Sequence, residues 1–314
     1  MHSPHFSVII PLYNDAGTIA RAVRSALRQT VQDVEIIVVN DGSEDEGPFI
    51  VEAIGDPRIR LLHQKNRGVS VARNRGIGES RSPLIAFLDA DDAWFPGFLE
   101  KIRKLAERFP ECGLYATRYF YQNPPGPKKV AAIRGVPEDF EGILRDYFDI
   151  AARSNPPVWT SATCARKDAL RRTGGFVEGV LSGQDLLAWA KLAVGSTVAY
   201  SMEPLATYYI DIDAVCRDRP AKPPERHDVV GEQLGLLCRE CAPSMRKSLG
   251  RYCAHWHKMR CSSYLRLGMR RDARREIEAA MRHYLDYQVL LYWFASFLPE
   301  RAIGRTFRLV KLFL

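Results

Sequence analysis

Short apolar runs rich in β-branched residues alternate with helical stretches through the first hundred residues of the chain. Four runs have the length of strands, and they cover Phe6–Ile10, Val34–Val39, Ile59–Leu62 and Leu84–Leu88. The second run is almost uniformly apolar, which is typical of a parallel strand buried on both faces. After the first run, apolar residues recur with the period of a helix that begins near Thr18. This alternation predicts an α/β fold, in which a mostly parallel sheet is flanked by helices.

Polar residues follow three of these runs. The clusters are Tyr13-Asn14-Asp15, Asp41-Gly42-Ser43 and Asp89-Ala90-Asp91-Asp92. Ligands of such sheets bind outside the carboxyl ends of the strands, so we expect the three clusters to converge on one crevice. The last cluster places carboxylates at i and i+2, an arrangement that can hold Mg²⁺ or Mn²⁺. An acidic turn that caps the next helix is the alternative interpretation.

Strand and helix patterns continue to about residue 210, interrupted by a loop or lid rich in Pro, Gly and Lys at Asn123–Pro137. We expect helices over 98–109 and 184–194, and strands over 114–119, 158–164 and 197–210. Arg217–His227 contains three prolines and is the best linker candidate. Beyond it only helical periodicity remains, with the clearest stripe at Ala273, Ile277, Ala280, Met281, Tyr284 and Leu285. The sequence therefore predicts one domain over residues 1–215 and a helical extension over 216–314.

The net charge of +8 is distributed unevenly along the chain. Residues 1–216 carry a net charge of −2, whereas residues 217–314 carry 20 Lys and Arg against 10 Asp and Glu. A basic part of this kind suggests a separate partner, and the candidates are an anionic membrane surface and nucleic acid. No known nucleic-acid-reading motif accompanies the charge, so we expect no nucleic-acid partner.

The carboxyl-terminal residues combine aromatic and basic side chains. Val289–Leu298 has one polar residue, Ser296, and is too short to span a bilayer. Further on, we expect a helix with an apolar face formed by Ile303, Phe307, Val310 and Leu314. Its basic face, mostly opposite, would be formed by Arg301, Arg305, Arg308 and Lys311. The start of the chain lacks a secretory signal pattern. We therefore expect a cytoplasmic protein, peripheral at the inner face of the cell membrane; a core-packing end helix is the alternative.

Seven cysteines are scattered through the chain, and their odd number indicates reduced thiols. A zinc site is one interpretation of the cysteines and histidines in the last third of the chain, and buried thiols are the other. The potential zinc ligands are Cys238, Cys241, Cys253, His255, His257 and Cys261. The two upstream cysteines fall in a helical pattern without the glycine of a zinc knuckle. Buried thiols in a helical bundle are therefore the favoured interpretation.

Four motifs, taken in order and with their spacing, resemble those of the family-two inverting GT-A glycosyltransferases. They are the segments Ser7 to Asn14, Val34 to Ser43, Asn66 to Ile77 and Phe87 to Asp92. Gly174-Gly175-Phe176 and the segment Gly183 to Trp189 resemble later signatures of the same family. The resemblance covers roughly residues 5–210. It implies a Rossmann-like GT-A domain that binds a nucleotide sugar through about residues 1–120 and the acceptor through about 121–215.

The resemblance also implies roles in binding the donor. Tyr13 and Asp41 would hold the nucleotide base, and Pro11 would shape the first loop. A flat ring and a carboxylate supply the stacking surface and the hydrogen-bond acceptors that a base requires. Arg73, in the helix that follows Gly68, would lie near the base or a phosphate.

The acidic residues would carry the chemistry. By resemblance, Asp89 would contact the ribose or the metal, and Asp91 would ligate Mn²⁺ or Mg²⁺ directly. Asp185 would be the general base, since it stands where the family places its catalytic Asp, four residues before Trp189. The chain departs from the family at Gln184, where Glu is usual, and so lacks one charge beside the base.

The implied reaction moves a sugar from a nucleotide-diphosphate donor, expected to be a UDP-sugar, to a hydroxyl of a glycan or lipid-linked glycan. The anomeric carbon would be inverted, with a divalent ion assisting the leaving diphosphate. A non-catalytic sugar-nucleotide-binding or scaffold protein on the same fold is the alternative.

Overall fold

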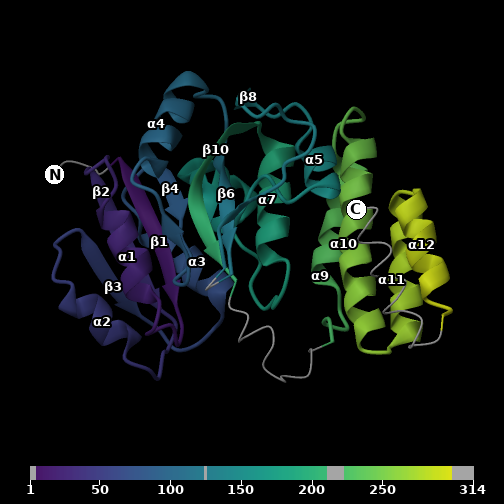
Figure 1. Ribbon diagram of the computed structural model, residues 1–314, viewed down its shortest axis with the longest axis horizontal. Coiled ribbons are helices and arrows are strands. Elements are labelled where there is room, and N and C mark those ends of the chain that lie inside the picture. The colour runs from purple at the N-terminus through teal and green to yellow at the C-terminus, as the bar shows by residue number, and fades with distance from the viewer. Residues whose placement is uncertain (1–4, 124–125, 211–222, 299–314) are drawn as a thin grey trace. The chain divides into compact units, whose positions relative to one another are not determined.

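The computed structural model describes residues 5–123, 126–210 and 223–298. The chain divides into two compact units, Met1–Val215 and Cys216–Leu314, each of which is described by itself. The first unit is a ten-stranded sheet flanked by helices, and the second is helical (Figure 1). The best linker candidate falls mostly on residues 211–222, which lie outside the described residues, as do 299–314 with the apolar and basic faces expected there.

One half of the sheet is parallel. The strands β1 (Phe6–Leu12), β2 (Val34–Asn40), β3 (Ile59–His63) and β4 (Leu84–Phe87) run parallel in the order β3-β2-β1-β4. The helices that follow β1, β2 and β3 are α1 (Ile19–Leu27), α2 (Gly47–Ala53) and α3 (Val69–Glu79). Every residue of β2 is buried, including the polar Glu35 and Asn40, as expected for a strand covered on both faces. The first strand extends two residues beyond the predicted run Phe6–Ile10. Pro11 therefore lies within β1, opposite Val39 and beyond the last pair that β1 forms with β4.

The other half of the sheet is mixed. The strand β9 (Thr163–Arg166) lies between β4 and β6 (Leu114–Gln122) and is antiparallel to both. Beyond β6, the strand β10 (Val198–Tyr209) continues the sheet in parallel pairing. Three short strands pair antiparallel to β10 or β6: β5 (Ala93–Trp94), β7 (Lys129–Val130) and β8 (Glu141–Ile143). The helices of this half are α4 (Phe98–Arg108), α5 (Tyr147–Arg153), α6 (Lys167–Thr173) and α7 (Gln184–Gly195).

The strand expected over residues 158–164 begins later than the apolar pattern predicts. A 3-10 turn, η1 (Thr160–Ala162), occupies its first part. The hydroxyl of Thr163 donates to the carbonyl of Trp159 at 2.6 Å. This local bond spans the turn, and the ladder begins at Thr163 itself, which pairs with Phe87 and Ala116.

The glycine pair at residues 174–175 joins α6 to a tight loop that is fixed to α3. Both glycines have positive φ, +79° at Gly174 and +66° at Gly175. The side chain of Asn74 accepts a hydrogen bond from the backbone N–H of Phe176 (2.9 Å) and donates to its carbonyl (2.8 Å). The ring of Phe176 then packs edge-on against Phe87 and against Trp189 of α7, with ring centroids 5.4 Å apart in each pair. The loop thereby joins α3, β4 and α7 around one aromatic group.

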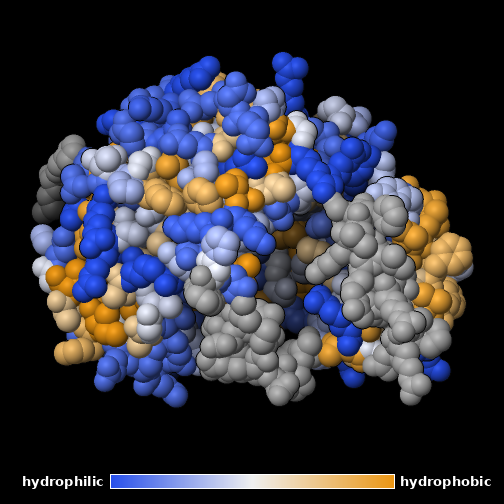
Figure 2. Space-filling view, in the orientation of Figure 1, coloured by the Kyte–Doolittle hydropathy of each residue, from blue (hydrophilic) through white to orange (hydrophobic). Residues whose placement is uncertain are grey.

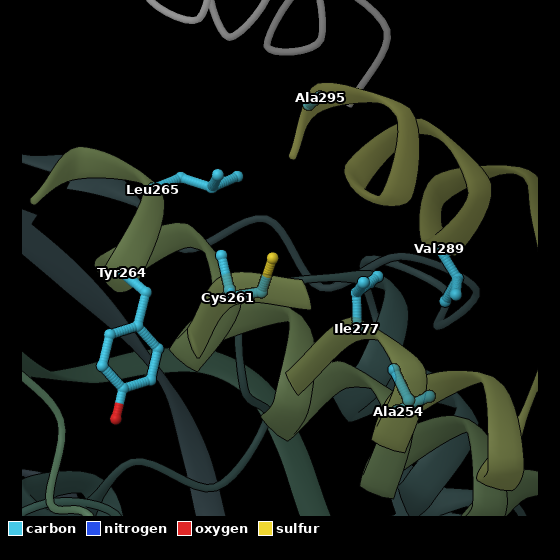
Figure 3. Packing of buried hydrophobic residues seen from close by; sticks show 9 residues of the cluster. Ala254, Cys261, Tyr264, Leu265, Ile277, Val289 and Ala295 are labelled. Carbon is cyan, nitrogen blue, oxygen red and sulfur yellow. The ribbon is translucent and has the colours of Figure 1, made fainter. Parts of the chain in front are cut away.

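The second unit contains four described helices: α9 (Val229–Glu240), α10 (Arg246–Arg266), α11 (Arg270–His283) and α12 (Tyr287–Ala295). Asp228 and Asp286 cap α9 and α12 by accepting backbone N–H groups. The core between α10, α11 and α12 includes Cys261, Ile277 and Val289 (Figure 3). The predicted stripe is correct except for its last residue. Leu285 lies beyond the end of α11 and is 58% exposed, because the helical period stops at His283.

Replacing Gly175 by Ala should destabilise the first unit more than replacing Gly174. Both changes place a side chain at positive φ, which costs about 1–2 kcal/mol. At Gly175 the new Cβ would also lie 2.6 Å from Oδ1 of Asn74, whereas at Gly174 nothing lies within 4 Å. The clash should disrupt the two Asn74–Phe176 hydrogen bonds and add about 1 kcal/mol or more. Urea unfolding of the two variants measures the difference, and equal losses would contradict this account of the loop.

Candidate active site

A cavity of about 390 Å³ opens at the carboxyl ends of β1, β2 and β4. Its walls contain residues of all three polar clusters that follow these strands, together with the start of α3 and of α7. The lining residues are Pro11, Leu12, Tyr13, Asp15, Asp41, Asn66, Gly68, Val69, Ala72, Arg73, Asp89, Ala90, Asp91 and Gln184. The structure thus places Pro11, Tyr13, Asp41, Arg73, Asp89 and Asp91, the donor and metal residues expected from the sequence, around one cavity.

The loops after β1 and β2 are bonded to each other beside this cavity. The backbone N–H of Asn14 donates to Oγ of Ser43 at 3.1 Å, and Oδ1 of Asn14 accepts from the backbone N–H of Glu44 at 2.8 Å. Asn14 has a φ of +56°, and among the described residues it alone adopts positive φ without being glycine. Asn tolerates this conformation because its side chain can bond to nearby backbone. The bonds hold Tyr13, which is 47% exposed, at the mouth of the cavity.

Asp41 fixes the loop that leads into α3. Its carboxylate is buried and accepts three hydrogen bonds, from Nε2 of Gln64 (2.7 Å) and from the backbone N–H groups of Arg67 (2.9 Å) and Gly68 (2.7 Å). Gly68 has a φ of +90°, a conformation that glycine adopts without strain. A carboxylate has about four acceptor positions, so Asp41 keeps one for a ligand.

Arg73 forms a short ion pair at the cavity wall. Its Nη2 lies 2.6 Å from Oδ1 of Asp89, and its guanidinium is 5.2 Å from the ring centroid of Phe176. The residue is only 4% exposed, and its Nε and Nη1 have no hydrogen-bond partner among the described residues. Asp89 is fixed a second time, because its backbone N–H donates to Oγ of Ser161 at 3.0 Å. The cavity wall therefore contains a rigid, largely buried cation, two of whose nitrogen donors are buried and have no partner among the described residues.

Four acidic side chains crowd this edge of the sheet. Burial, reinforced by the charges of Asp89 and Asp15, raises the pKa of Asp91 to about 6. Burial also raises the pKa of Asp15, with the charges of Asp45 and Asp89 adding to the effect. Asp92 differs from the others, since it is buried away from the cavity and accepts the backbone N–H of Tyr209 at 3.1 Å. Its role is to join this turn to β10.

Asp15 and Gln64 were not among the residues singled out from the sequence. Asp15 lines the cavity, and its place in the polar cluster after β1 was the available signal. Gln64 had no such signal, because its contact with Asp41 depends on the path of the loop after β3.

Asp185 and Gln184 lie at the first turn of α7, after Gly183, which has a φ of +80°. The carboxylate of Asp185 accepts the backbone N–H of Leu186 at 2.8 Å, and the hydroxyl of Thr160 donates to it at 3.4 Å. Gln184 lines the cavity, and its buried Oε1 has no hydrogen-bond partner among the described residues. Asp185 itself is absent from the described lining.

The turn η1 connects Asp185 to the acidic edge. Thr160 binds the carboxylate of Asp185, and the next residue, Ser161, accepts the backbone N–H of Asp89. Two consecutive residues therefore hold the start of α7 and the end of β4. This arrangement places a carboxylate, an amide acceptor, a buried arginine and a group of acids around one end of the sheet.

A mixed sheet flanked by helices, with a cavity at the carboxyl ends of its parallel strands, is a fold of GT-A type, and comparison with known proteins gives the family. The model of the family "Glycosyl transferase family 2" matches residues 7–170, slightly more than half of the chain. The chain belongs to this family. The fold class expected from the sequence, α/β of GT-A type with a helical carboxyl-terminal part, is confirmed.

Similar proteins occur in several bacteria. The succinoglycan biosynthesis protein ExoO of Rhizobium meliloti is 44% identical over 111 residues, which are 35% of this chain and 31% of that protein. The uncharacterised glycosyltransferase EpsJ of Bacillus subtilis is 42% identical over 118 residues, 36% of this chain and 34% of that protein. The matched part thus spans about a third of the length of these relatives.

Solved structures share the fold at low sequence identity. TarS of S. aureus, residues 1–349 in complex with UDP-GlcNAc, superimposes with a TM-score of 0.69 and 16% identity, covering 96% of this chain and 89% of that one. The mannosyltransferase PcManGT of Pyrobaculum calidifontis, in complex with GDP-Man and Mn²⁺, gives a TM-score of 0.61 at 19% identity and covers 99% and 81%. At such identities the likeness establishes the fold alone.

Asp91→Asn should stabilise the metal-free protein at neutral pH. The pKa of Asp91 in the folded chain lies above its ordinary value of 3.8, so the wild-type protein loses stability as pH rises from about 4 to about 6. Because Asn does not ionise, the variant does not lose this stability. At pH 7 its free energy of unfolding should exceed that of the wild type by on the order of 1 kcal/mol, which corresponds to a rise in Tm of about 2–4 °C. Melting curves in EDTA at pH 4 and pH 7 measure the effect, which should be larger at pH 7.

The matched control is Asp168→Asn. Arg172 lowers the pKa of Asp168 through a hydrogen bond at the surface. This variant should therefore gain nothing at pH 7. If Asp91→Asn melted at a lower temperature than the wild type at pH 7, the charge of Asp91 would not destabilise the metal-free protein, contrary to this prediction.

Proposed function

We propose that this protein transfers a sugar from a nucleoside-diphosphate donor, a UDP-sugar, to a hydroxyl of a glycan or lipid-linked glycan, with inversion of the anomeric carbon. The observation that carries the proposal is the convergence of Tyr13, Asp41, Arg73, Asp89 and Asp91 on one cavity at the carboxyl end of the sheet. Membership of the family and the folds of TarS and PcManGT support it.

The base of the donor would bind between the first two loops. Tyr13 offers an aromatic face at the mouth of the cavity, and stacking of a base on such a face contributes about 1–3 kcal/mol. Asp41, whose other acceptor positions are occupied by the loop before α3, would accept an N–H from the base edge. Because the loop fixes this carboxylate before the ligand arrives, binding requires little further ordering of the site.

The diphosphate would lie beside Arg73. The guanidinium is held by Asp89 and by the ring of Phe176, and its unpartnered Nε and Nη1 can donate to phosphate oxygens. A buried arginine that already has one carboxylate partner brings no uncompensated charge into the cavity. Arg73 therefore positions Asp89 and offers donors to the leaving group.

The residues present fit a hard divalent cation. The cavity wall provides only oxygen donors at its acidic edge, and the crowding that raises the pKa of Asp91 would be relieved by a positive ion. Asp91 and Asp89 would hold Mn²⁺ or Mg²⁺, with Asp15 next to them. When bound, such an ion stabilises the negative charge that develops on the departing diphosphate. The complex of PcManGT with GDP-Man and Mn²⁺ supports this choice of metal.

Asp185 would be the general base. The hydroxyl of Thr160 and the backbone N–H of Leu186 orient its carboxylate, which would take the proton of the acceptor hydroxyl as that oxygen attacks the anomeric carbon. The bond from the anomeric carbon to the diphosphate oxygen breaks on the opposite side, so the configuration inverts. Gln184, with its unpartnered Oε1 at the cavity, would accept a hydrogen bond from a sugar hydroxyl.

The helical unit would attach the enzyme to an anionic membrane surface. No described helix is long and apolar enough to cross a bilayer. On and after α12, however, Leu290, Leu291, Phe294 and Phe297 are 39–61% exposed. A hydrophobic patch is visible at the surface in the region of α12 (Figure 2). The guanidinium of Arg274 lies 5.1 Å from the ring centroid of Phe297, so positive charge accompanies the apolar group. Apolar insertion combined with basic residues is typical of peripheral attachment at the inner face of a membrane.

Asp185→Asn should stop turnover and leave donor binding intact. Loss of a positioned general base lowers the rate by about 10²–10⁴-fold, while the cavity wall is unchanged. Asp91→Ala should instead abolish the part of the UDP-induced rise in Tm that depends on Mn²⁺. Asp168→Asn is the control for both, since its carboxylate pairs with Arg172 on the surface. Full transfer by Asp185→Asn would exclude Asp185 as the base, and metal-dependent UDP binding without transfer in the wild type would favour a non-catalytic binding protein.

Leu290→Ser combined with Phe294→Ser should weaken binding to vesicles that contain anionic lipid. Each buried apolar side chain contributes up to about 1.5–3 kcal/mol, so partial insertion of two predicts a loss of about tenfold or more in co-sedimentation affinity. Phe49→Ser is the control, because Phe49 is 70% exposed on α2 of the other unit. Unchanged sedimentation of the double variant would show that α12 does not insert.

A further inference from the structure

Three side chains from three successive helices of the second unit meet at one point. They are Cys238 on α9, Cys253 on α10 and His283 at the end of α11. Their potential ligand atoms, two Sγ and one ring nitrogen, all lie within 4.8 Å of one another. Cys253 is buried, whereas Cys238 and His283 are half-buried, so an ion could reach the cluster from solvent.

Two thiols and an imidazole are ligands that zinc prefers. Zinc binds thiolate sulfur at about 2.3 Å and imidazole nitrogen at about 2.0–2.1 Å, which places tetrahedral ligands about 3.5–3.8 Å apart. The three ligand atoms, all within 4.8 Å of one another, lie close to this spacing. The six cysteines that the structure describes are free thiols, so neither sulfur is consumed by a disulfide.

The cluster has unused bonding capacity. The thiol of Cys253 donates to the carbonyl of Leu234 at 3.5 Å and that of Cys238 to the carbonyl of Arg246 at 3.7 Å, which leaves the lone pairs of both sulfur atoms available to a metal. The ring nitrogens of His283 have no hydrogen-bond partner among the described residues.

A second cluster of potential metal ligands lies nearby, but its polar groups are already bonded to other protein groups. Asp228, His257 and Glu276 also lie within ligand distance of one another. There, Nε of Arg260 lies 3.2 Å from Asp228 and 2.8 Å from Glu276, and Nδ1 of His257 lies 2.8 Å from Glu276. The guanidinium of Arg260 neutralises those acids, so that cluster is already satisfied by protein groups. The ring of His257 stacks on that of His283, with centroids 5.6 Å apart, and thereby holds its plane.

We propose that Cys238, Cys253 and His283 bind one Zn²⁺ ion, with water in the fourth position. Binding would release the thiol protons of both cysteines and leave two thiolates on the metal. The ion would cross-link α9, α10 and α11, which are otherwise joined by packing and hydrogen bonds. The ligand set differs from the one considered from the sequence: Cys261 lies in the apolar core, and His257 is bonded to Glu276.

Co²⁺ substitution of the reduced full-length protein tests the site directly. Tetrahedral Co²⁺ with two thiolate ligands gives a sulfur-to-metal charge-transfer band in the near ultraviolet and strong visible bands, whereas Co²⁺ on carboxylates gives neither. We expect these bands to saturate at one equivalent and to disappear when one equivalent of Zn²⁺ is added. The experiment uses the Asp91→Ala background, so that the acidic edge of the first unit contributes no strong metal site. Absence of the thiolate band in wild-type and Asp91→Ala protein alike would overturn the proposal.

Variants locate the ligands. Cys253→Ser and His283→Gln should each lose the zinc that remains after dialysis, and zinc should no longer raise the Tm of the protein. Cys241→Ser and Cys261→Ser remove other thiols of the same unit and should retain one equivalent of zinc. Because His283 is half-buried, its replacement by Gln should fold, which keeps the test decisive even if Cys253→Ser does not. Retention of zinc by His283→Gln, or its loss in Cys241→Ser, would contradict the assigned ligands.

A redox function is the competing outcome. Thiol counting after mild oxidation shows whether Cys238 and Cys253 form a disulfide. A disulfide that forms in apo protein and is blocked by one equivalent of Zn²⁺ would support the shared site. A disulfide in a protein whose reduced form retains no zinc would overturn the metal proposal and assign the pair to thiol chemistry.

Discussion

The buried ion pair between Arg73 and Asp89 is the interaction on which the arrangement of the cavity depends. A guanidinium that is 4% exposed has lost most of its hydration, and the carboxylate at 2.6 Å compensates for this loss. The pair joins the middle of α3 to the end of β4, two elements that approach the cavity from different sides. Removing Asp89 would leave the charge of Arg73 buried and unpaired, which is more costly than the pair itself is stabilising.

The surroundings of this pair explain several features that are distant in the sequence. Phe176 packs under the guanidinium, and its own position depends on Asn74 and on the absence of a side chain at Gly175. Trp189 of α7 closes the other edge of the Phe176 ring. Gly174, Gly175 and Trp189 thus help to hold the Phe176 ring against the guanidinium of Arg73, although none of them is among the described residues that line the cavity.

The parallel half of the fold and most of the acidic edge could be predicted from the sequence. Buried strands have an unmistakable apolar pattern, and the chain order of parallel strands brings polar residues such as Asp41 and Asp91 to one edge. The position of β9 could not be predicted, because a four-residue strand between two others is decided by tertiary pairing. Asp15 was visible only as part of a turn, and the contact of Gln64 with Asp41 has no local signature at all. In the second unit, periodicity indicated the core but missed His283, since a helix-ending histidine carries no pattern of its own.

The turn η1 has a consequence for how such an enzyme can diversify. Thr160 and Ser161 are adjacent, yet one binds the carboxylate at the head of α7 and the other the backbone at the end of β4. A substitution that tilts this turn would move both groups together. Under the proposed function, evolution of a new acceptor preference through this segment would therefore also change how the donor is bound. Sequence changes that affect the binding of only one substrate would have to occur in other loops, whose positions do not depend on Thr160 or Ser161.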